Sequence, residues 1–374
     1  VNRALRMDRK VYLAARLRPM TPRELSMGGK SCVVVDGNCT TIVNPETGDA
    51  KAFVLDYSFD SSEPGDKTGN YADNLVLFRE LGTLVIRNAL EGHNTCLFAH
   101  GASQSGKTFT LIGQESDPGL LPRFLESLFQ QDPVVNGDVI VRASFYELAN
   151  EQVRDVLQRD FYSPGGLKVR MKGEGQGCEI EGLSKVRLET MTDCEDLLAR
   201  VLQSLSGISP AAHTIFTAEL YAATYVANPD PSRPLKQTLE PLSKVHLIDI
   251  AGANAGGDPV LGTRQKRGGP ADKSLLAWAN VMSALAETQM AHIVGSRAPK
   301  IHVPFRGSAL TRVLEDSMGS GSRCIVVATL SPSHLAYKET LNTFRHIVRT
   351  KEVKKVARNE SILNAYLGEA DFVP

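Results

Sequence analysis

One octapeptide constrains this chain more than any other feature of its sequence. Residues 101–108 read Gly-Ala-Ser-Gln-Ser-Gly-Lys-Thr, which fits the pattern Gly-x-x-x-x-Gly-Lys-Thr of phosphate-binding loops. The apolar run Asn94–Ala99 before it is typical of a buried strand, and Phe109–Ile112 after it can continue as a helix. The motif requires a strand, a loop and a helix in that order, and a chance turn rich in glycine and serine does not explain both flanks. The sequence therefore predicts binding of a nucleoside triphosphate.

The side chains of this loop indicate how the phosphates are held. Glycines let backbone N–H groups curl around a phosphate, and the following helix N-terminus adds positive potential. Lys107 would reach the β- and γ-phosphates, and the Thr108 hydroxyl would ligate Mg²⁺. Downstream, an apolar strand ends in Asp249, with Gly252 three residues later. An Asp at a strand end is often only a turn former, but beside such a loop it predicts a magnesium-holding carboxylate, with a glycine amide that senses the γ-phosphate.

The bulk composition excludes several classes of partner. The chain has 374 residues, with 42 Lys and Arg against 42 Asp and Glu, so no global charge favours nucleic acid or a membrane surface. No apolar run approaches the length of a bilayer span, and residues 1–10 lack the apolar core of a secretory signal. The six cysteines form no Cys-x-x-Cys pair. We expect a reduced, cytoplasmic protein without structural zinc.

Strand-like and helical patterns alternate along the chain. Because some of the strands are apolar throughout, they predict a central sheet covered on both faces, as in an α/β domain of the phosphate-loop NTPase type. The expected strands are Val11–Leu17, Val33–Val35, Thr95–Ala99, Val139–Tyr146, Val245–Ile250 and Cys324–Leu330. The expected helices are Asn74–Leu90, Leu120–Phe129, Asp193–Leu205 and Lys273–Met290.

Five motifs, in order, resemble those of the kinesin motor domain. Arg16–Pro19 is similar to the family's Arg-x-Arg-Pro beside the adenine, and Phe98–Thr108 to Phe-Ala-Tyr-Gly-Gln-Thr-Gly-x-Gly-Lys-Thr. Asp249–Gly252 matches the start of switch II, Asp-Leu-Ala-Gly-Ser-Glu. Pro304–Leu314 resembles Pro-Tyr-Arg-Asp-Ser-Lys-Leu-Thr-Arg-Leu-Leu at the microtubule face, and Glu339–Arg345 resembles Glu-Thr-Leu-Asn-Thr-Leu-Arg of the final helix.

This resemblance implies a domain organisation. Residues 1–10 would form an N-terminal extension or cover strand, 11–348 the motor domain, and 349–374 a segment like the family's neck linker. Thr40–Pro45 and the insert Tyr57–Asn70 most resemble the monomeric vesicle-transport class. The resemblance also implies that the chain is a fragment, whose stalk, coiled coil and cargo regions lie elsewhere. Such a stalk would allow pairing with a second kinesin chain.

The departures from the family pattern concern hydrolysis. Family switch I reads Asn-x-x-Ser-Ser-Arg-Ser-His, whereas the aligned segment Ser206–His213 keeps only the first serine of the pair and the histidine. The second serine, which helps to hold Mg²⁺ and the attacking water, is Pro210, which has no hydroxyl and no N–H. The switch I arginine is Ala211, and its glutamate partner in switch II is Asn254. Because both partners are lost, no charge is stranded.

We therefore expect hydrolysis to be very slow or absent, because removing one pre-organised group typically lowers the rate by roughly a hundredfold to a thousandfold. The alternative is an active, microtubule-stimulated ATPase motor whose missing groups are replaced by His213, Ser209, Gln104 or Asn254. A second alternative, an unrelated phosphate-loop signalling NTPase, does not explain the matches at 304–314 and 339–345.

The motifs and the resemblance together give a set of candidate site residues. The catalytic candidates are Asp249, Gly252 and His213. The candidates for binding ATP or ADP are Arg16, Arg18, Pro19, Gly101, Ala102, Ser103, Gln104, Ser105, Gly106, Lys107, Thr108 and Phe109. Thr108 would ligate Mg²⁺ directly and Asp249 through water. Arg16 could instead be an exposed charge at a strand end, and Phe109 could be a core residue rather than stack on adenine.

The resemblance also implies a microtubule-binding surface. Tubulin is acidic, so a chain of zero net charge needs local basic clusters to bind it. Gly262–Arg267 leads into the helix Lys273–Met290, and Pro270, in place of a family asparagine, predicts that this helix begins later. The chain would then act in the cytoplasm on the microtubule cytoskeleton. The candidate contacts are Arg264, Lys266, Arg267, Lys273, Arg306 and Arg312.

Overall fold

The computed structural model describes residues 11–63, 71–158, 165–173, 177–209, 211–226, 236–252, 270–294, 301–319 and 321–348. The expected segments 1–10 and 349–374 lie outside the described residues. So do Pro210 and Asn254, and the basic candidates Arg264, Lys266 and Arg267.

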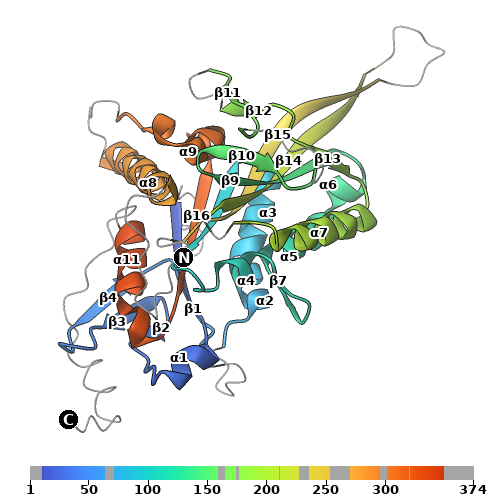
Figure 1. Cartoon of the computed structure of the whole chain (residues 1–374). Coiled ribbons are helices and arrows are strands. Elements are labelled where there is room, and N and C mark those ends of the chain that lie inside the picture. Colours follow the sequence, from blue (N-terminus) through green and yellow to red (C-terminus); the bar gives the residue numbers. More distant parts are fainter. Residues whose placement is uncertain are drawn as a thin grey trace.

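A nine-stranded mixed sheet forms the centre of the molecule (Figure 1). Its parallel part joins β15, β6, β16, β1 and β5, and its antiparallel part joins β10, β9, β14 and β15, with β13 paired to β9. In spatial order the strands are β10 (Gln152–Asp155), β9 (Val139–Ala149), β14 (His213–Val226), β15 (Lys236–Asp249), β6 (Thr95–Gly101), β16 (Arg323–Leu330), β1 (Val11–Leu17) and β5 (Tyr57–Asp60), and β13 is Val186–Leu188.

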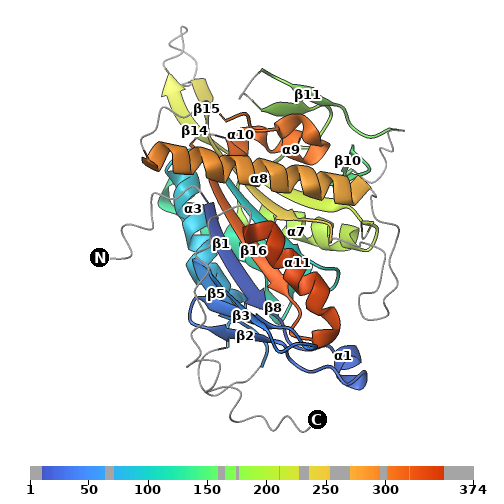
Figure 2. The same cartoon turned by 90° about the vertical axis from the view of Figure 1, so that its left-hand side faces the viewer.

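Helices cover both faces of this sheet (Figure 2). One face carries α2 (Asn74–Leu77), a π-helical turn (Phe78–Gly82), α3 (Thr83–Leu90), α4 (Lys107–Leu111), α5 (Leu120–Leu128), α6 (Asp132–Val135) and α7 (Met191–Leu205). The other carries α8 (Pro270–Val294), a 3₁₀ turn (Phe305–Gly307), α9 (Ala309–Val313), α10 (Glu315–Met318), a 3₁₀ turn (His334–Ala336) and α11 (Tyr337–Val348). The expected fold class is confirmed.

Smaller elements decorate the two ends of the sheet. A short helix and a three-stranded sheet lie at one end, and two small hairpins connect the larger elements. They are α1 (Pro22–Ser26), β2 (Val33–Asp36), β3 (Cys39–Val43), β4 (Ala50–Val54), the pair β7 (Gly113–Gln114) and β8 (Asp117–Pro118), and the pair β11 (Val169–Met171) and β12 (Cys178–Ile180).

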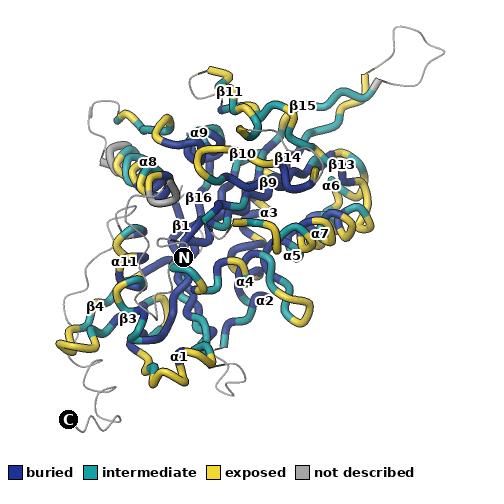
Figure 3. The backbone as a smooth tube through the Cα atoms, in the orientation of Figure 1, coloured by how far each residue is buried: buried dark blue, intermediate teal, exposed yellow. Residues whose placement is uncertain are grey.

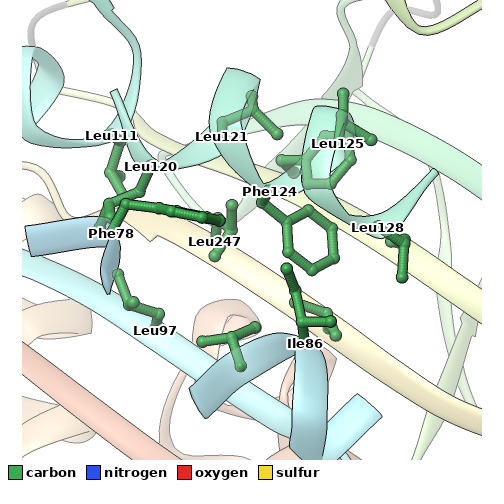
Figure 4. Packing of buried hydrophobic residues seen from close by; sticks show 14 of the residues in the cluster. Phe78, Ile86, Leu97, Leu111, Leu120, Leu121, Phe124, Leu125, Leu128 and Leu247 are labelled. Carbon is green, nitrogen blue, oxygen red and sulfur yellow. The ribbon is translucent and has the colours of Figure 1, made fainter. Parts of the chain in front are cut away.

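Two apolar cores lie on opposite faces of the sheet, because alternate residues of a strand point to opposite sides. Along β6, Leu97 and Ala99 belong to one core and Cys96 and Phe98 to the other. The buried backbone runs through the middle of the molecule in Figure 3. Figure 4 shows the first core, with Phe124 of α5 packed among leucines of the neighbouring elements. Strand β6 is thus held rigidly, and the loop that follows it starts from a fixed point.

Most of the expected elements are present, with two differences. Strands β14 and β15 form a long hairpin that projects from the body (Figure 1), and the sequence pattern predicted only the end of β15. The last described residues of β14, Tyr225 and Val226, are exposed, so this part of the hairpin has no buried face to create an alternating pattern. Helix α8 begins at Pro270 rather than later, because proline suits the first turn of a helix, where its missing N–H has no partner to lose. Of the helices in the described part of the chain, none has the length and apolar character to cross a membrane.

Candidate functional site

The phosphate loop leaves the carboxyl end of β6 and turns into α4. A Cβ on Gly101 would lie 2.4 Å from the Thr329 carbonyl oxygen of β16, so only glycine fits there. Gly106 has φ +100°, a conformation that L side chains rarely adopt. Gln104 also has a positive φ, 61°, at the position where the family pattern places glycine. The loop therefore keeps the expected backbone shape with a costlier residue at one position.

Lys107, Thr108 and Asp249 come together beside this loop, as the sequence predicted. The Lys107 ammonium is buried, and it donates to the Ala102 carbonyl oxygen at 2.7 Å. The Thr108 hydroxyl donates to Asp249 Oδ2 at 2.6 Å. Burial lowers the pKa of Lys107, and the Asp249 carboxylate opposes that shift. Burial raises the pKa of Asp249, against the effect of Lys107 and Thr108.

The same two oxygen-bearing side chains fit a magnesium ion. Mg²⁺ prefers oxygen ligands and is usually held by one or two protein groups, with waters and phosphate oxygens completing the shell. The Thr108 hydroxyl and the Asp249 carboxylate lie within hydrogen-bond distance of each other, at the start of α4 and the end of β15. The donor set is therefore chemically suitable for this ion.

Gly252 lies against the backbone of the phosphate loop. A Cβ at this position would be 2.8 Å from the Ser103 nitrogen and 3.1 Å from the Ala102 carbonyl carbon. The segment after β15 thus contacts the loop directly, and any larger residue at position 252 would push the two apart.

His213, the third catalytic candidate, is held on both sides of its ring. Its Nδ1 accepts the backbone N–H of Ala251 at 3.0 Å, so Nε2 carries the proton and donates to Ser274 Oγ at 2.6 Å. Burial lowers the pKa of His213 to about 4, which keeps the ring neutral. The ring joins β14, the segment after β15 and helix α8, and it does not line the cavity next to the loop.

That cavity has a volume of about 420 Å³. One part of its wall is polar and comes from the phosphate loop, the start of α4 and the end of β15: Ser103, Gln104, Lys107, Thr108, Asp249 and Gly252. Most of the remaining wall consists of apolar side chains from α4, α5, β9, β14 and β15. The end of α7 and the residues that follow it, including Ser209 and Ala212, complete the wall. Among the described lining residues, Lys107 is the one cation and Asp249 the one anion.

Arg16, an adenine candidate, is buried inside the domain. Its Nη1 donates to Asn74 Oδ1 at 2.6 Å and Thr110 Oγ1 at 2.9 Å, and its Nε donates to Ser61 Oγ at 3.1 Å. The guanidinium carbon lies 5.2 Å from the centre of the Phe109 ring, a cation–π contact. Burial lowers the pKa of Arg16 to about 10. The alternative of an exposed strand-end charge is therefore wrong.

Arg18 supports the loop from outside. Its Nε donates to the Gln104 carbonyl oxygen at 2.9 Å, and Nη1 donates to the Pro19 carbonyl oxygen. Both Nη atoms also bind the Glu24 carboxylate at 2.7 Å. Burial acts to raise the pKa of Glu24, but hydrogen bonds from Arg18, Thr21 and Ser331 lower it to about 2.

Glu24 was missing from the candidates, although a sequence signal exists. Thr21 and Glu24 form a capping box at the start of α1, and a Thr followed three residues later by Glu is its recognisable pattern. What the pattern could not reveal is that the same carboxylate also holds Arg18. Arg18, Pro19 and Phe109 do not line the cavity, so an adenine bound near them would lie apart from its apolar wall.

The described basic candidates belong to α8, the 3₁₀ turn Phe305–Gly307 and α9, and α8 and α9 lie side by side in Figure 2. Lys273 is exposed on α8 and Arg306 is exposed in the 3₁₀ turn before α9. Arg312 of α9 lies 3.7 Å from the Glu151 carboxylate, so its charge is partly balanced. Gly307 packs against α8, where an added Cβ would be 3.2 Å from Ala277 Cβ. The turn that carries Arg306 therefore lies against the helix that carries Lys273.

Comparison with known proteins identifies relatives over most of the chain. The model of the kinesin motor domain matches residues 16–353. Kinesin-like protein KIF16B of Mus musculus is 35% identical over 366 residues, covering 92% of this chain and 27% of that protein. Kinesin-like protein KIF1A of Rattus norvegicus is 34% identical over 361 residues, covering 92% and 20%. The chain thus spans about a quarter of the length of these curated relatives.

Solved structures show the same architecture. KIF14 residues 391–772, described as a dimer in a two-heads-bound state with AMP-PNP on a microtubule, superposes with a TM-score of 0.75 at 27% identity. That match covers 96% of this chain and 99% of the other. KIF14 residues 391–755, with ADP on a microtubule, gives a TM-score of 0.73 at 27% identity, covering 93% and 96%.

Proposed function

Because the chain belongs to the kinesin family of motor domains, we propose that it binds ATP or ADP with Mg²⁺, binds microtubules, and hydrolyses ATP very slowly or not at all. In this proposal it is a microtubule tether in the cytoplasm rather than a fast motor. The observation that carries the slow hydrolysis is the make-up of the cavity wall, in which Lys107 is the one cation among the described residues.

Nucleotide binding follows from the phosphate loop. The buried Lys107 ammonium exchanges its bond to the Ala102 carbonyl for phosphate oxygens, and the N–H groups at the start of α4 face the same charge. Thr108 and Asp249 hold Mg²⁺, which supplies positive charge to the β- and γ-phosphates. Gly252, in contact with Ser103, is close enough to respond to a phosphate in the loop. Arg18 fixes the loop at Gln104.

Hydrolysis lacks its usual groups. Phosphoryl transfer depends on positioning and electrostatic stabilisation, with little covalent chemistry by the protein. On the switch I side the described wall includes Ile208, Ser209, Ala212 and Thr214, none of which carries a charge. Ala211, at the position of the family arginine, has a methyl side chain that can neither carry charge nor position water. Pro210 and Asn254 replace the remaining hydroxyl and carboxylate of the family pattern. A deficit of about a hundredfold to a thousandfold is expected for one lost group, and more for several.

We assign His213 a positioning role instead of a catalytic one. Both ring nitrogens are used, one by the Ala251 N–H and one by Ser274. The ring therefore holds the segment that carries Gly252 against β14 and α8. In this arrangement it has no nitrogen left to accept a proton from an attacking water.

The alternative of an active motor with replaced groups keeps one supporting observation. Ser209 and Gln104 line the same cavity as Lys107, and each could orient a water molecule by a hydrogen bond. His213 no longer contributes to that alternative. Hydrolysis by this route would depend on Ser209 or Gln104, which a single substitution can remove.

Microtubule binding rests on Lys273 and Arg306, with Arg312 contributing less because Glu151 balances part of its charge. Basic side chains on adjacent elements attract an acidic surface even when the net charge is zero. We also propose that the chain can pair with a second kinesin chain, through a stalk that is not part of this sequence. Neither nucleic acid nor a membrane surface is a proposed partner of this domain.

Restoring the lost groups tests the account of slow hydrolysis. We expect the triple variant Pro210→Ser, Ala211→Arg, Asn254→Glu to turn over ATP at least tenfold faster than the parent, with similar affinity for ADP. The variant Lys172→Arg, a conservative change at an exposed side chain, controls for effects of substitution and purification that do not involve the site. Equal turnover in the parent and in the triple variant, with both folded and binding ADP, would remove the explanation offered here.

A further inference from the structure

Thr21 and Pro22 form the start of α1, a short helix at the periphery of the molecule (Figures 1 and 2). They lie in the sequence Pro19-Met20-Thr21-Pro22, which has a proline on each side of the threonine. A proline disfavours helical backbone at the residue before it, and Thr21 is accordingly extended, with φ −75° and ψ 153°. The segment therefore presents a hydroxyl on an extended, proline-flanked backbone.

The two prolines distinguish Thr21 from the other hydroxyl residues of the chain. Proline-directed serine/threonine kinases bind their substrates as extended segments and accept a proline directly after the acceptor, where its missing N–H needs no partner. Many of them also favour a proline two residues before the acceptor. The sequence has four serines or threonines followed by proline, and only Thr21 also has a proline two residues earlier. The other three are Ser163, Ser209 and Ser331, and the last of these is buried.

The Thr21 hydroxyl is close to the surface. Of the five residues of α1, Glu24 is the buried one, and Figure 3 shows most of this helix as exposed. Leu25, for example, is 59% exposed. Thr21 itself is half-buried, because its hydroxyl donates to Glu24 Oε2 at 3.0 Å. A short helix with one buried residue can open locally at a small cost in free energy, so a kinase can reach this hydroxyl without unfolding the domain.

A phosphate at Thr21 would disturb an ion pair of the folded protein. The Glu24 carboxylate accepts a hydrogen bond from the Thr21 hydroxyl and one from each Nη atom of Arg18, the latter two at 2.7 Å. Burial acts to raise the pKa of Glu24, but these hydrogen bonds lower it to about 2, so the carboxylate is charged at neutral pH. A phosphate ester at Oγ1 has no proton to donate, and it brings a charge of about −1.5 to −2. It therefore repels Glu24 and offers Arg18 a second anionic partner.

The remaining hydrogen bond of Arg18 connects this ion pair to the phosphate loop. Its Nε donates to the Gln104 carbonyl oxygen at 2.9 Å, and Gln104 has a positive φ of 61°. A non-glycine residue in this conformation is strained and persists only where its surroundings hold it. Movement of the Arg18 guanidinium toward a phosphate at Thr21 would remove one such support from the loop.

We propose that Thr21 is a phosphorylation site for a proline-directed serine/threonine kinase, and that the phosphate weakens nucleotide binding in the phosphate loop. In the reaction the Thr21 hydroxyl oxygen forms a bond to the γ-phosphorus of the ATP held by the kinase, and the bond from that phosphorus to the β–γ bridging oxygen breaks. ADP leaves, and the hydroxyl proton passes to a carboxylate of the kinase. The modification site stands on the sequence and the surface alone, whereas its effect on nucleotide rests on the proposed function.

The site is tested by incubating the whole chain with a purified mitogen-activated protein kinase and ATP. Mass spectrometry is expected to show one phosphate, located on Thr21. Pro22→Ala keeps the hydroxyl and removes the proline, and it is expected to slow the reaction by about tenfold or more. The matched control is Pro45→Ala, at an exposed proline outside α1, which is expected to react like the parent. A phosphate on another residue, or equal rates for the two variants, would overturn the site.

The effect is tested by titrating the phosphorylated and the unmodified chain with fluorescent ADP. Phosphorylation is expected to weaken ADP binding by about tenfold or more. Thr21→Val, which loses the hydrogen bonds of the hydroxyl without gaining charge, is expected to weaken it by less than about threefold. Equal affinity of the phosphorylated and unmodified chains would overturn the effect on nucleotide. Failure of the unmodified chain to bind ADP would refute the proposed function, and the mass measurement would still decide the modification site.

Discussion

Burial and the proposed phosphate binding have opposite effects on the charge of Lys107. Burial disfavours its charge and lowers its pKa, while a bound phosphate needs that charge. Its hydrogen bond to Ala102 and the nearby Asp249 carboxylate keep the ammonium partly compensated without a ligand. A ligand with negative oxygens therefore replaces a weaker partner by a stronger one.

Replacing Lys107 by Met should strongly weaken nucleotide binding with little loss of stability. The methionine side chain has a similar length and suits a buried position, so the stability should not fall, while the phosphate loses its charged partner. We expect the affinity for fluorescent ADP to fall by about a hundredfold or more, the range for a buried charge-assisted contact. Lys172→Met, at a side chain 51% exposed, is the control. Unchanged ADP affinity would place the nucleotide elsewhere.

His100 introduces an acid-sensitive group directly before the phosphate loop. It replaces the family tyrosine and is buried, and neither ring nitrogen has a hydrogen-bond partner within the described residues. The His100 ring stacks on the His346 ring with 5.6 Å between the ring centroids. Its centroid lies 5.3 Å from that of the Trp278 ring. Burial, with additional effects of His346 and Lys107, lowers its pKa to about 3. The folded state therefore keeps His100 neutral in acid, where the unfolded chain takes up a proton.

The sign of the resulting pH dependence follows from these two states. Stability contributed by a neutral His100 is complete above its unfolded pKa of 6.5 and is lost as the pH falls toward about 3. At pH 5 the loss is about 2 kcal/mol at most, from 1.36 kcal/mol per pH unit. His100→Tyr should gain stability relative to the parent in urea unfolding at pH 5 compared with pH 7. The exposed His302→Tyr should show no such gain, and a gain equal at both pH values would contradict the role given to His100.

At the scale of elements, α1 stabilises the phosphate loop through an ion pair. The capping box that starts α1 orients Glu24, and Glu24 binds Arg18, which in turn holds the Gln104 carbonyl oxygen. Ser331, at the end of β16, also donates to the Glu24 carboxylate. One buried carboxylate thus connects a peripheral helix, a central strand and the loop.

Glu24→Gln should loosen this connection. The amide can keep some of the hydrogen bonds but not the charge, so we expect a loss of about 1–3 kcal/mol in the free energy of unfolding at pH 7 and weaker ADP binding. Because the pKa of Glu24 is lowered from 4.5 to about 2, its contribution is complete above pH 4.5 and is lost as the pH falls toward 2. The difference between parent and variant should therefore shrink between pH 5 and pH 3. Glu179→Gln, at an exposed carboxylate, is the control, and a constant difference would argue against the ion pair.

The elements also show what sequence reasoning could reach. The phosphate loop, β6 and the helices of both faces follow from apolar patterns and motif spacing, because burial on a sheet face leaves a regular trace. The contacts of Arg16 could not be predicted, since Ser61, Asn74 and Thr110 are brought to it by three separate parts of the chain. His213 was placed by its motif but not by its partners, and Ser274 of α8 has no signal in the sequence. The pattern locates residues, and tertiary packing decides their hydrogen bonds.

At the scale of the whole molecule, the two faces of the sheet separate the nucleotide site from the proposed microtubule surface. The phosphate loop opens toward the face of α4, α5 and α7, while α8 and α9 lie on the other face (Figure 2). The exposed basic residues Lys273 and Arg306 belong to α8 and to the turn before α9. His213 bridges them, from β14 to Ser274 of α8. A change at the loop can therefore reach the proposed microtubule surface through a short series of contacts.

The double variant Lys273→Ala, Arg306→Ala should weaken microtubule binding. Both side chains are exposed on adjacent elements, and their loss should reduce co-sedimentation by about tenfold, with a smaller dependence on salt concentration. Stability and ADP affinity should not change. Arg87→Ala, on the exposed side of α3, is the control. Full co-sedimentation of the double variant would locate the tubulin contacts on other residues.

The measurement that most directly tests the central claim is steady-state phosphate release with and without microtubules, together with co-sedimentation in ATP and in ADP. The account predicts that the chain co-sediments with microtubules, and that phosphate release stays near the background both with and without microtubules. Strong stimulation of phosphate release by microtubules would contradict it, and would show that groups such as Ser209 or Gln104 have taken over the chemistry of the lost switch residues.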